Sequence, residues 1–386
     1  MKKIGILTYI KEYTNLGTNM QSYCTLKAVQ RAFPDDRVEL IDYSLSRPSR
    51  KPYLSNVSWH SLRDDYVRMK KYRAFFKEEL TFSAAGLISS NVDESIEYIK
   101  KQNYDAIYVG SDTVLELRGA RQDGLTAYWL DPAIDCKKFL IAASSLNVVY
   151  ESLSKKQKEK IQKAIDGFSL LGVRDDATFR LLSKFASKGD GRLRIIPDPT
   201  FTYEIDYGYV ERYLAKRKMV IDKPIVCLHL TRDAQWAREA SDYFRKEGFV
   251  IASLRPAYYA DVIFTDLSPF EQMGIYKYFH LVITHRFHDS IFCFKNHTPV
   301  IVFPEYVADV TRYGENKNLT LLRSFNVDKI NYIENKNKIS ARYLIDIYQD
   351  AIRNVKYYEP LIRTVLNEHK KKYESFLNDS KRIFMA

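Results

Sequence analysis

Residues 281–294 read LVITHRFHDSIFCF, which combines a buried β-strand, a short polar loop and the apolar start of a helix. The strand ends at Thr284, and Arg286 and His288 follow within four positions. Strand, loop and helix in this order are the repeating unit of a parallel α/β sheet. Because ligands of such sheets bind at the carboxyl ends of the strands, the loops that directly follow strands are the places to look for function.

The same alternation predicts the rest of the fold. In the first half, apolar runs predict strands at residues 4–9, 38–42, 106–110, 138–142, 168–173 and 193–196. The pattern restarts with strands predicted at residues 224–230, 249–254, 281–284 and 300–303. We therefore expect an α/β protein of two facing Rossmann-like domains, residues 1–205 and 206–340. Residues 341–386 should form a C-terminal helical segment, one long helix kinked at Pro360.

Composition excludes several classes of protein. With 46% hydrophobic and 28% charged residues the chain can bury ordinary cores, and no apolar run approaches the ~18 residues of a membrane span. The four cysteines are far apart and form no metal-type pair, which fits free thiols in a reducing cytoplasm. Residues 4–10 read as a strand and not as a signal peptide, so we expect a cytoplasmic protein. A P-loop, a dinucleotide fingerprint, a zinc pattern and a nucleophile elbow are all missing from the sequence.

A formal net charge of +12 indicates an anionic partner. Much of this charge lies at residues 47–77, which overlap an amphipathic helix expected at 61–80. The apolar face of that helix should carry Leu62, Tyr66, Met69, Tyr72, Phe76 and Leu80. The helix could touch an anionic membrane surface, or its basic residues could simply form a solvated face. Because the basic residues form no recognised nucleic-acid module, we expect no nucleic-acid partner.

The loop after residue 284 carries the strongest functional signal. Arg286 and His288 lie at a predicted helix N-terminus, where the backbone N–H groups already favour an anion. Arginine adds a planar fork for carboxylate or phosphate, and histidine can move protons near neutral pH. Local capping and pairing could explain either residue alone, whereas the cluster favours function. His285 is either a donor-site residue or structural, and Asp289 is expected to orient a ring or to cap the helix.

Two further loops follow strands in the first half. Arg174 places a cation after the strand at 168–173, with pairing to Asp175 as the alternative. Gly110-Ser111-Asp112 follows the strand at 106–110, where Asp112 could accept a proton or a hydrogen bond from a sugar hydroxyl. A simple turn with a helix cap is the alternative interpretation here.

Taken in order, these loops resemble the polysaccharide pyruvyl transferase family. The resemblance runs from residue 4 to about residue 325, through Gly5-Ile-Leu-Thr-Tyr9, Asn15-Leu16-Gly17, Gln21-Ser22-Tyr23, Tyr104-Asp105-Ala106-Ile107, Gly110-Ser111-Asp112, Ala142-Ala-Ser144, Val173-Arg174-Asp175, Asp198-Pro199-Thr200 and Arg286-Phe287-His288 to Pro299. The sequence departs from the family pattern at Thr113, Leu115 and Asp289. A lysine that assists donor binding in part of the family has no clear match, and Arg312 and Lys317 are candidates for its place.

The resemblance implies a GT-B-like fold and phosphoenolpyruvate as donor and co-substrate. We expect no cofactor, and nothing in the sequence indicates a metal. By the family's pattern, Arg174, Arg286 and His288 would be the donor-binding and catalytic positions. We expect Arg174, Arg286 and His285 to bind the donor. We hypothesise catalysis by His288 and Asp112, and acceptor binding by Asn15, Gln21 and Ser111 on the first domain. The acceptor would be a glycan or a lipid-linked oligosaccharide, which would place the protein in the cytoplasm, peripheral at the inner membrane face. The alternatives are a GT-B-type glycosyltransferase that uses a sugar nucleotide, and a non-catalytic glycan-binding protein.

Overall fold

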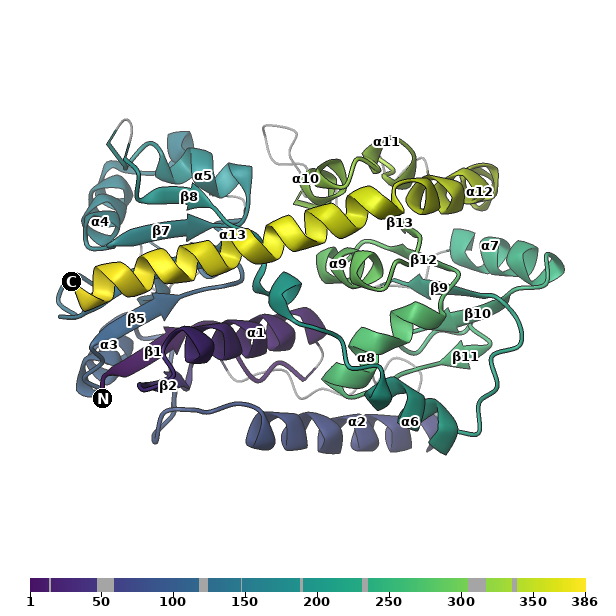
Figure 1. Ribbon diagram of the computed structural model, residues 1–386, viewed down its shortest axis with the longest axis horizontal. Coiled ribbons are helices and arrows are strands. Elements are labelled where there is room, and N and C mark those ends of the chain that lie inside the picture. Colours follow the sequence, from purple (N-terminus) through teal and green to yellow (C-terminus); the bar gives the residue numbers. More distant parts are fainter. Residues whose placement is uncertain are drawn as a thin grey trace. The chain divides into compact units, whose positions relative to one another are not determined.

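Two parallel β-sheets, each in its own compact unit, form the framework of the computed structural model (Figure 1). Unit 1 comprises Met1–Ser49, Phe76–Tyr203 and Glu368–Ala386, and unit 2 comprises Arg50–Phe75 and Glu204–Asn367. The structure describes residues 1–13, 15–46, 59–117, 124–146, 148–187, 190–230, 235–304, 317–334 and 339–386. Each unit is thus assembled from segments that are separated in sequence, and the C-terminal segment contributes to both.

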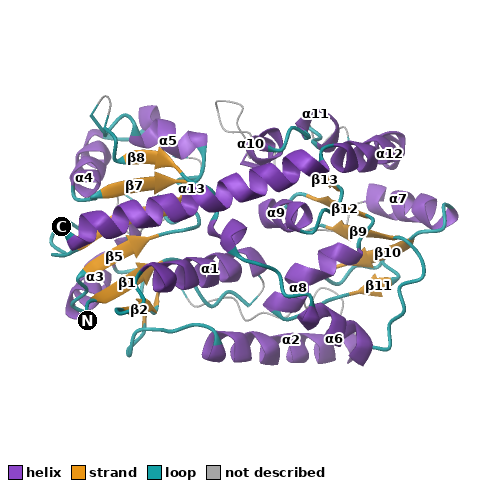
Figure 2. Cartoon of the chain, viewed as in Figure 1, coloured by secondary structure: helices purple, strands orange, loops and turns teal. Residues whose placement is uncertain are grey.

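The sheet of unit 1 has six strands in the order β2-β1-β5-β6-β7-β8, all parallel and accompanied by helices (Figure 2). Its strands are β1 (Lys3–Leu7), β2 (Arg37–Leu40), β5 (Ala106–Val109), β6 (Lys137–Ala143), β7 (Leu170–Val173) and β8 (Leu193–Ile195). A small second sheet pairs β3 (Tyr43–Ser44) with β4 (Leu87–Ile88). The helices of this unit are α1 (Leu16–Ala32), α3 (Val92–Lys101), α4 (Lys155–Asp166) and α5 (Asp176–Leu182), with 3-10 helices η1 (Ala127–Trp129), η2 (Tyr150–Ser152) and η3 (Pro199–Thr202).

The central strands β5, β6 and β7 of unit 1 are buried on both faces, since successive side chains point to opposite sides of the sheet and both sides are covered. In β5, Ile107 and Val109 belong to the core that α3 and α4 cover. Tyr108 lies on the other face, where it stacks on Phe139 at 4.8 Å. Its hydroxyl is 2.8 Å from that of Ser380 near the C-terminus, so the last helix of the chain covers this face.

The sheet of unit 2 has five parallel strands in the order β11-β10-β9-β12-β13. They are β9 (Ile225–His229), β10 (Val250–Ser253), β11 (Val262–Ile263), β12 (Leu281–Thr284) and β13 (Val300–Val302). Its helices are α6 (Gly208–Lys216), α7 (Gln235–Lys246), α8 (Pro269–Ile275), η4 (Tyr276–Tyr278), α9 (Phe287–Lys295), α10 (Lys317–Ser324), α11 (Asp328–Asn331) and α12 (Ala341–Tyr357). Val226 and Leu228 of β9 pack in the core with residues of α7 and α12, whereas His229 turns to the opposite face and reaches α9.

The C-terminal segment forms two helices and not the single kinked helix that was expected. Helix α12 ends before its C-cap residue Tyr358, and α13 (Glu359–Met385) begins directly after it. Pro360 is the second residue of α13, in the first turn, where a backbone N–H has no partner within the helix and its loss costs nothing. The proline therefore starts a helix at this point and does not bend one.

The prediction of the apolar face of the helix at 61–80 is wrong for the first half of the helix. The helix is α2 (Trp59–Glu78), and Leu62 and Tyr66 on it are 39% and 70% exposed. Asp65 and Arg68 are buried in their place, joined by an ion pair of 2.7 Å. Because these two polar side chains pair with each other, they can occupy the buried face of the helix. This face continues through Tyr72 and Phe76, as predicted.

Candidate functional site

The turn between β12 and α9 places Arg286 and His288 at a helix N-terminus in unit 2. Arg286 is the N-cap residue of α9, and its side chain makes no capping hydrogen bond to the first turn. Its backbone N–H donates instead to the hydroxyl of Thr284 at 3.1 Å. Arg286 and His288 are both half-buried. The first turn of a helix beside a guanidinium group is suited to a carboxylate or a phosphate.

Aromatic rings surround the imidazole of His288. Its ring centroid lies 5.3 Å from that of Phe287 and 6.2 Å from that of Phe292, which is nearly parallel to it. Packed rings of this kind restrict the rotamer of the imidazole, and a fixed orientation is what a group that transfers a proton requires.

Of the residues predicted beside this turn, His285 and Lys317 lie in the described part of unit 2. His285 is buried with its ring 5.6 Å from that of Phe303, and its carbonyl accepts a hydrogen bond from Asn318 at 3.0 Å. Lys317 has its ammonium group 5.6 Å from the ring centroid of Phe287. Arg312, the other candidate cation, lies outside the described residues. The donor-binding role of His285 stays a prediction.

In unit 1 the loop after β5 is tightly constrained. Gly110 has a φ of +117°, and a Cβ at this position would lie 2.1 Å from the carbonyl oxygen of Ile141, so only glycine fits. Asp112 also has a positive φ, 78°, which is costly for a residue with a side chain. Its carboxylate accepts hydrogen bonds from the hydroxyl of Thr18 at 2.7 Å and from the N–H of Thr113 at 2.8 Å. These contacts fix the orientation of the carboxylate that was predicted as a base.

Arg174 lies at the end of β7 between two carboxylates of unit 1. Its guanidinium group is 3.2 Å from Asp198 and 3.6 Å from Asp112, and its side chain is only 3% exposed. The alternative partner expected from sequence, Asp175, instead caps α5 through a hydrogen bond from the N–H of Thr178. A guanidinium group held in this way orders the strand ends of unit 1, and its contact with the donor stays a prediction.

The three predicted acceptor residues differ in their surroundings. Gln21 and Ser111 are completely buried. The Gln21 amide donates to Asp198 at 2.5 Å, and the Ser111 carbonyl accepts from the hydroxyl of Thr8 at 2.9 Å. Asn15 is half-buried and caps α1. The structure thus gives Gln21 and Ser111 an internal role, while acceptor binding by the three residues is untested.

Sequence reasoning missed two charged residues at strand ends. Glu12, in the loop after β1, has its pKa raised by burial and then by the negative charge of Asp112. Arg255 follows β10 and donates to the carbonyl of Leu230 at 2.8 Å. Both residues stand in loops directly after strands, so the same rule that singled out Arg174 and Arg286 could have found them.

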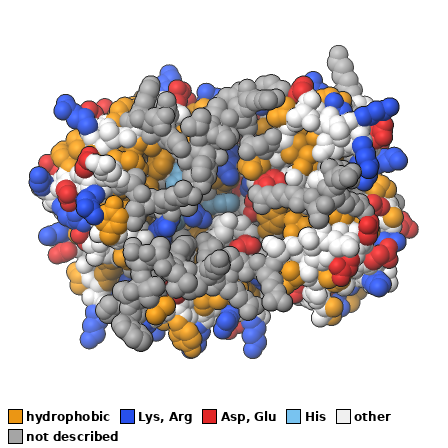
Figure 3. All heavy atoms as spheres, turned by 180° about the vertical axis from the view of Figure 1, so that it is seen from behind, with side chains coloured by type: hydrophobic (Ala, Val, Ile, Leu, Met, Phe, Trp, Pro, Cys, Tyr) orange, Lys and Arg blue, Asp and Glu red, His pale blue; other side chains and the backbone are white. Residues whose placement is uncertain are grey.

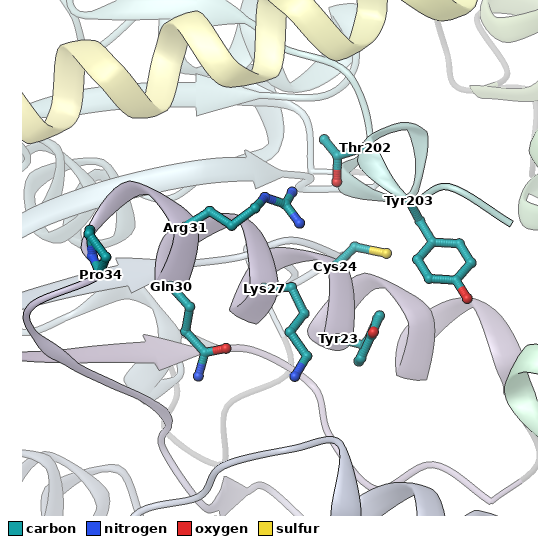
Figure 4. Close-up of a pocket in the computed structure, with 8 residues that line it drawn as sticks. All are labelled: Tyr23, Cys24, Lys27, Gln30, Arg31, Pro34, Thr202 and Tyr203. Atoms are coloured by element: carbon teal, nitrogen blue, oxygen red, sulfur yellow. The ribbon is translucent and has the colours of Figure 1, made fainter. Parts of the chain in front are cut away.

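The described residues of unit 1 also line a pocket of about 480 Å³ beside α1 (Figure 4). Lys27 and Arg31 reach it from α1, and Tyr23 and Tyr203 meet edge to face with ring centroids 5.8 Å apart. None of its lining residues is acidic. Cations beside tyrosine rings can hold a sugar that carries an acidic substituent.

The family model for polysaccharide pyruvyl transferases matches residues 15–305, a range that contains all eight predicted site residues. The chain belongs to the polysaccharide pyruvyl transferase family. The resemblance inferred from the strand-end loops is thereby confirmed. Family membership implies transferase activity, a pyruvyl donor and a polysaccharide acceptor. No curated protein sequence matches this chain significantly.

Solved structures similar to this member of the pyruvyl transferase family include UDP-GlcNAc 2-epimerases of two organisms and a further protein bound to UDP. The enzyme of Neisseria meningitidis, bound to UDP-GlcNAc, covers 100% of this chain and 98% of its own, with a TM-score of 0.56 and 9% identity. The structure of S. aureus MnaA with UDP covers 94% of this chain and 91% of its own, with a TM-score of 0.52 and 10% identity. The UDP-GlcNAc 2-epimerase of Methanocaldococcus jannaschii covers 94% of this chain and 99% of its own, with a TM-score of 0.51 and 13% identity. These likenesses confirm the expected GT-B-like α/β fold.

Among the described residues, no helix is long and apolar enough to cross a membrane. Nor does any group of three or more His, Cys, Asp or Glu side chains in this part of the chain form a constellation that could hold a metal ion.

Proposed function

We propose that the protein transfers pyruvate from phosphoenolpyruvate to a sugar of a polysaccharide or of a lipid-linked oligosaccharide precursor, and forms a pyruvate ketal. The observation that carries this proposal is the N-terminus of α9, where the N-cap residue Arg286 makes no side-chain capping hydrogen bond and His288 is the second residue of the helix. Phosphoenolpyruvate bears a carboxylate and a phosphate, and both suit the backbone N–H groups and the guanidinium fork.

In the proposed reaction, protonated His288 gives its proton to the methylene carbon of phosphoenolpyruvate. This makes a methyl group and leaves positive charge on the carbon that bears the phosphate. A sugar hydroxyl attacks that carbon and loses its proton to a base, for which we propose Asp112. The carbon–oxygen bond to phosphate then breaks with its electron pair on phosphate, and a second hydroxyl adds with loss of a proton to close the ketal.

Binding of phosphoenolpyruvate tests the donor. We expect Arg286→Ala to weaken binding roughly 10–100-fold, because charge-assisted hydrogen bonds contribute about 1.5–3 kcal/mol. Isothermal calorimetry at low salt measures this, with Arg353→Ala as the control, since Arg353 is 74% exposed on α12 and belongs to the same unit. A well-folded wild type that binds sugar nucleotides but not phosphoenolpyruvate would replace this function with the glycosyltransferase alternative.

For a lipid-linked acceptor, we propose that α2 contacts anionic lipid. Its exposed side chains include Arg63, Lys70, Arg73 and Lys77, spaced so that they lie on one side of the helix. On the face shown in Figure 3, the coloured basic side chains are dispersed among acidic and apolar ones. A stripe of four cations on one helix is therefore the better candidate for a lipid surface.

Vesicle flotation tests the contact with lipid. We expect Lys70→Glu with Arg73→Glu to reduce binding to vesicles containing phosphatidylserine about tenfold or more, since each cation contributes about 1 kcal/mol near such a surface. The matched control reverses two exposed cations of another helix, Lys371→Glu with Lys372→Glu on α13. Equal flotation with neutral and anionic vesicles would remove the proposed contact.

A further inference from the structure

A buried hydrogen-bond network lies directly behind the Arg286–His288 turn. Its centre is Asp289, the third residue of α9, which is buried. One carboxylate oxygen accepts from Nδ1 of His229 at 2.6 Å and from the Thr284 hydroxyl at 2.7 Å. The other accepts from the Tyr276 hydroxyl at 2.7 Å. Three donors from three different elements thus converge on one carboxylate.

The network follows from the pairing of β9 with β12. His229 and Thr284 are the last residues of these strands and are partners in the parallel register. The alternation of side chains along β9 turns His229 toward α9, while Leu228 enters the opposite core. Asp289 occupies the first turn of α9, where the helix dipole favours a negative charge. The ends of two strands and the start of one helix are therefore tied together.

The charge states of this network follow from its surroundings. Burial alone would raise the pKa of Asp289, but the interactions with His229, Arg286 and Thr284 outweigh it and hold that pKa below its usual value. Burial lowers the pKa of His229, which makes the neutral ring the stable form near pH 7. A neutral ring that faces a carboxylate through Nδ1 carries its proton on Nδ1.

The network reaches the donor-binding turn through its backbone. The N–H of Arg286 donates to the Thr284 hydroxyl, and this hydroxyl in turn donates to Asp289. A change at His229 therefore alters the hydrogen bonding of Asp289, then of Thr284, and then of the backbone at Arg286. A buried charge is costly unless all of its hydrogen-bond partners are present. We therefore expect His229, Thr284, Tyr276 and Asp289 to keep a single arrangement, which is lost when one partner is removed.

We propose that His229 is a positioning residue for the Arg286–His288 turn and acts through Asp289. It does so by donating its Nδ1 proton, and its Nε2 atom is not required. This inference rests on the proposed function only for the identity of the donor. The arrangement of the turn itself can be measured without any ligand.

Three substitutions of His229 distinguish the roles of its two ring nitrogen atoms. His229→Asn keeps a donor near the position of Nδ1, His229→Gln places one near Nε2, and His229→Leu removes both. We expect His229→Leu and His229→Gln to weaken phosphoenolpyruvate binding roughly 10–100-fold, and His229→Asn to bind within about threefold of wild type. His280→Asn is the matched control, because His280 is a half-buried histidine of unit 2 that packs on Phe249.

Hydrogen exchange followed by mass spectrometry supplies the readout that needs no ligand. The peptide spanning residues 284–290 should exchange about tenfold faster in His229→Leu, and at the wild-type rate in His229→Asn, with α7 unchanged in both. Unchanged exchange in His229→Leu, or rescue by glutamine instead of asparagine, would overturn the inference. If the exchange pattern holds but wild type binds no phosphoenolpyruvate, the proposed donor is wrong and the positioning role stands.

Discussion

Replacing His288 with alanine should lower the turnover number for pyruvyl transfer by about 10²–10⁴-fold, the usual effect of removing a positioned acid–base group. The imidazole lies next to the rings of Phe287 and Phe292, which restrict its rotamer and therefore the direction in which it delivers a proton. Donor affinity should change less than about tenfold, because Arg286 and the helix N-terminus are retained. Release of inorganic phosphate in the presence of the acceptor glycan measures turnover.

Two variants make this result interpretable. His288→Gln keeps a hydrogen-bond donor but cannot deliver a proton to carbon, so it should be as slow as His288→Ala. His297→Gln alters another partly exposed histidine of unit 2, beside Glu359, and should retain wild-type turnover. Near-normal turnover of His288→Ala would assign the proton donor to a different group and reject the proposed mechanism.

The strand-end loops are the part of the structure that sequence predicts well. The run at residues 281–284 matches β12, and α9 starts three residues after it, so Arg286 and His288 stand where the pattern placed them. This works because a buried parallel strand has a continuous apolar sequence and its loop is polar, which marks the end of the strand clearly.

Contacts between distant segments are the part that sequence does not predict. Asp289 was expected to orient a ring, and the structure identifies that ring as His229, 60 positions earlier. Asp65 and Arg68 look like surface residues until their mutual ion pair is seen to be buried. Both cases depend on which polar groups satisfy each other inside the fold, and hydrophobic periodicity carries no information about that.

Arg174→Ala should lower the free energy of unfolding by about 3–5 kcal/mol, the range for removing one partner of a buried ion pair. The loss is large because Asp198 and Asp112 remain, and Asp198 is buried. Asp198 also accepts hydrogen bonds from Gln21 and Thr200, so its carboxylate connects α1, η3 and the end of β7. Urea denaturation followed by circular dichroism measures the change.

An exposed ion pair supplies the comparison that decides whether burial is the cause. Arg363 pairs with Glu359 at 2.8 Å on α13, and its side chain is 64% exposed. Arg363→Ala should therefore change stability by less than about 1 kcal/mol. In the double variant Arg174→Ala with Asp198→Asn, part of the loss should be recovered, because the amide carries no uncompensated charge. If Arg174→Ala proved as mild as Arg363→Ala, the structural role of Arg174 would be rejected, and its predicted donor-binding role would gain support.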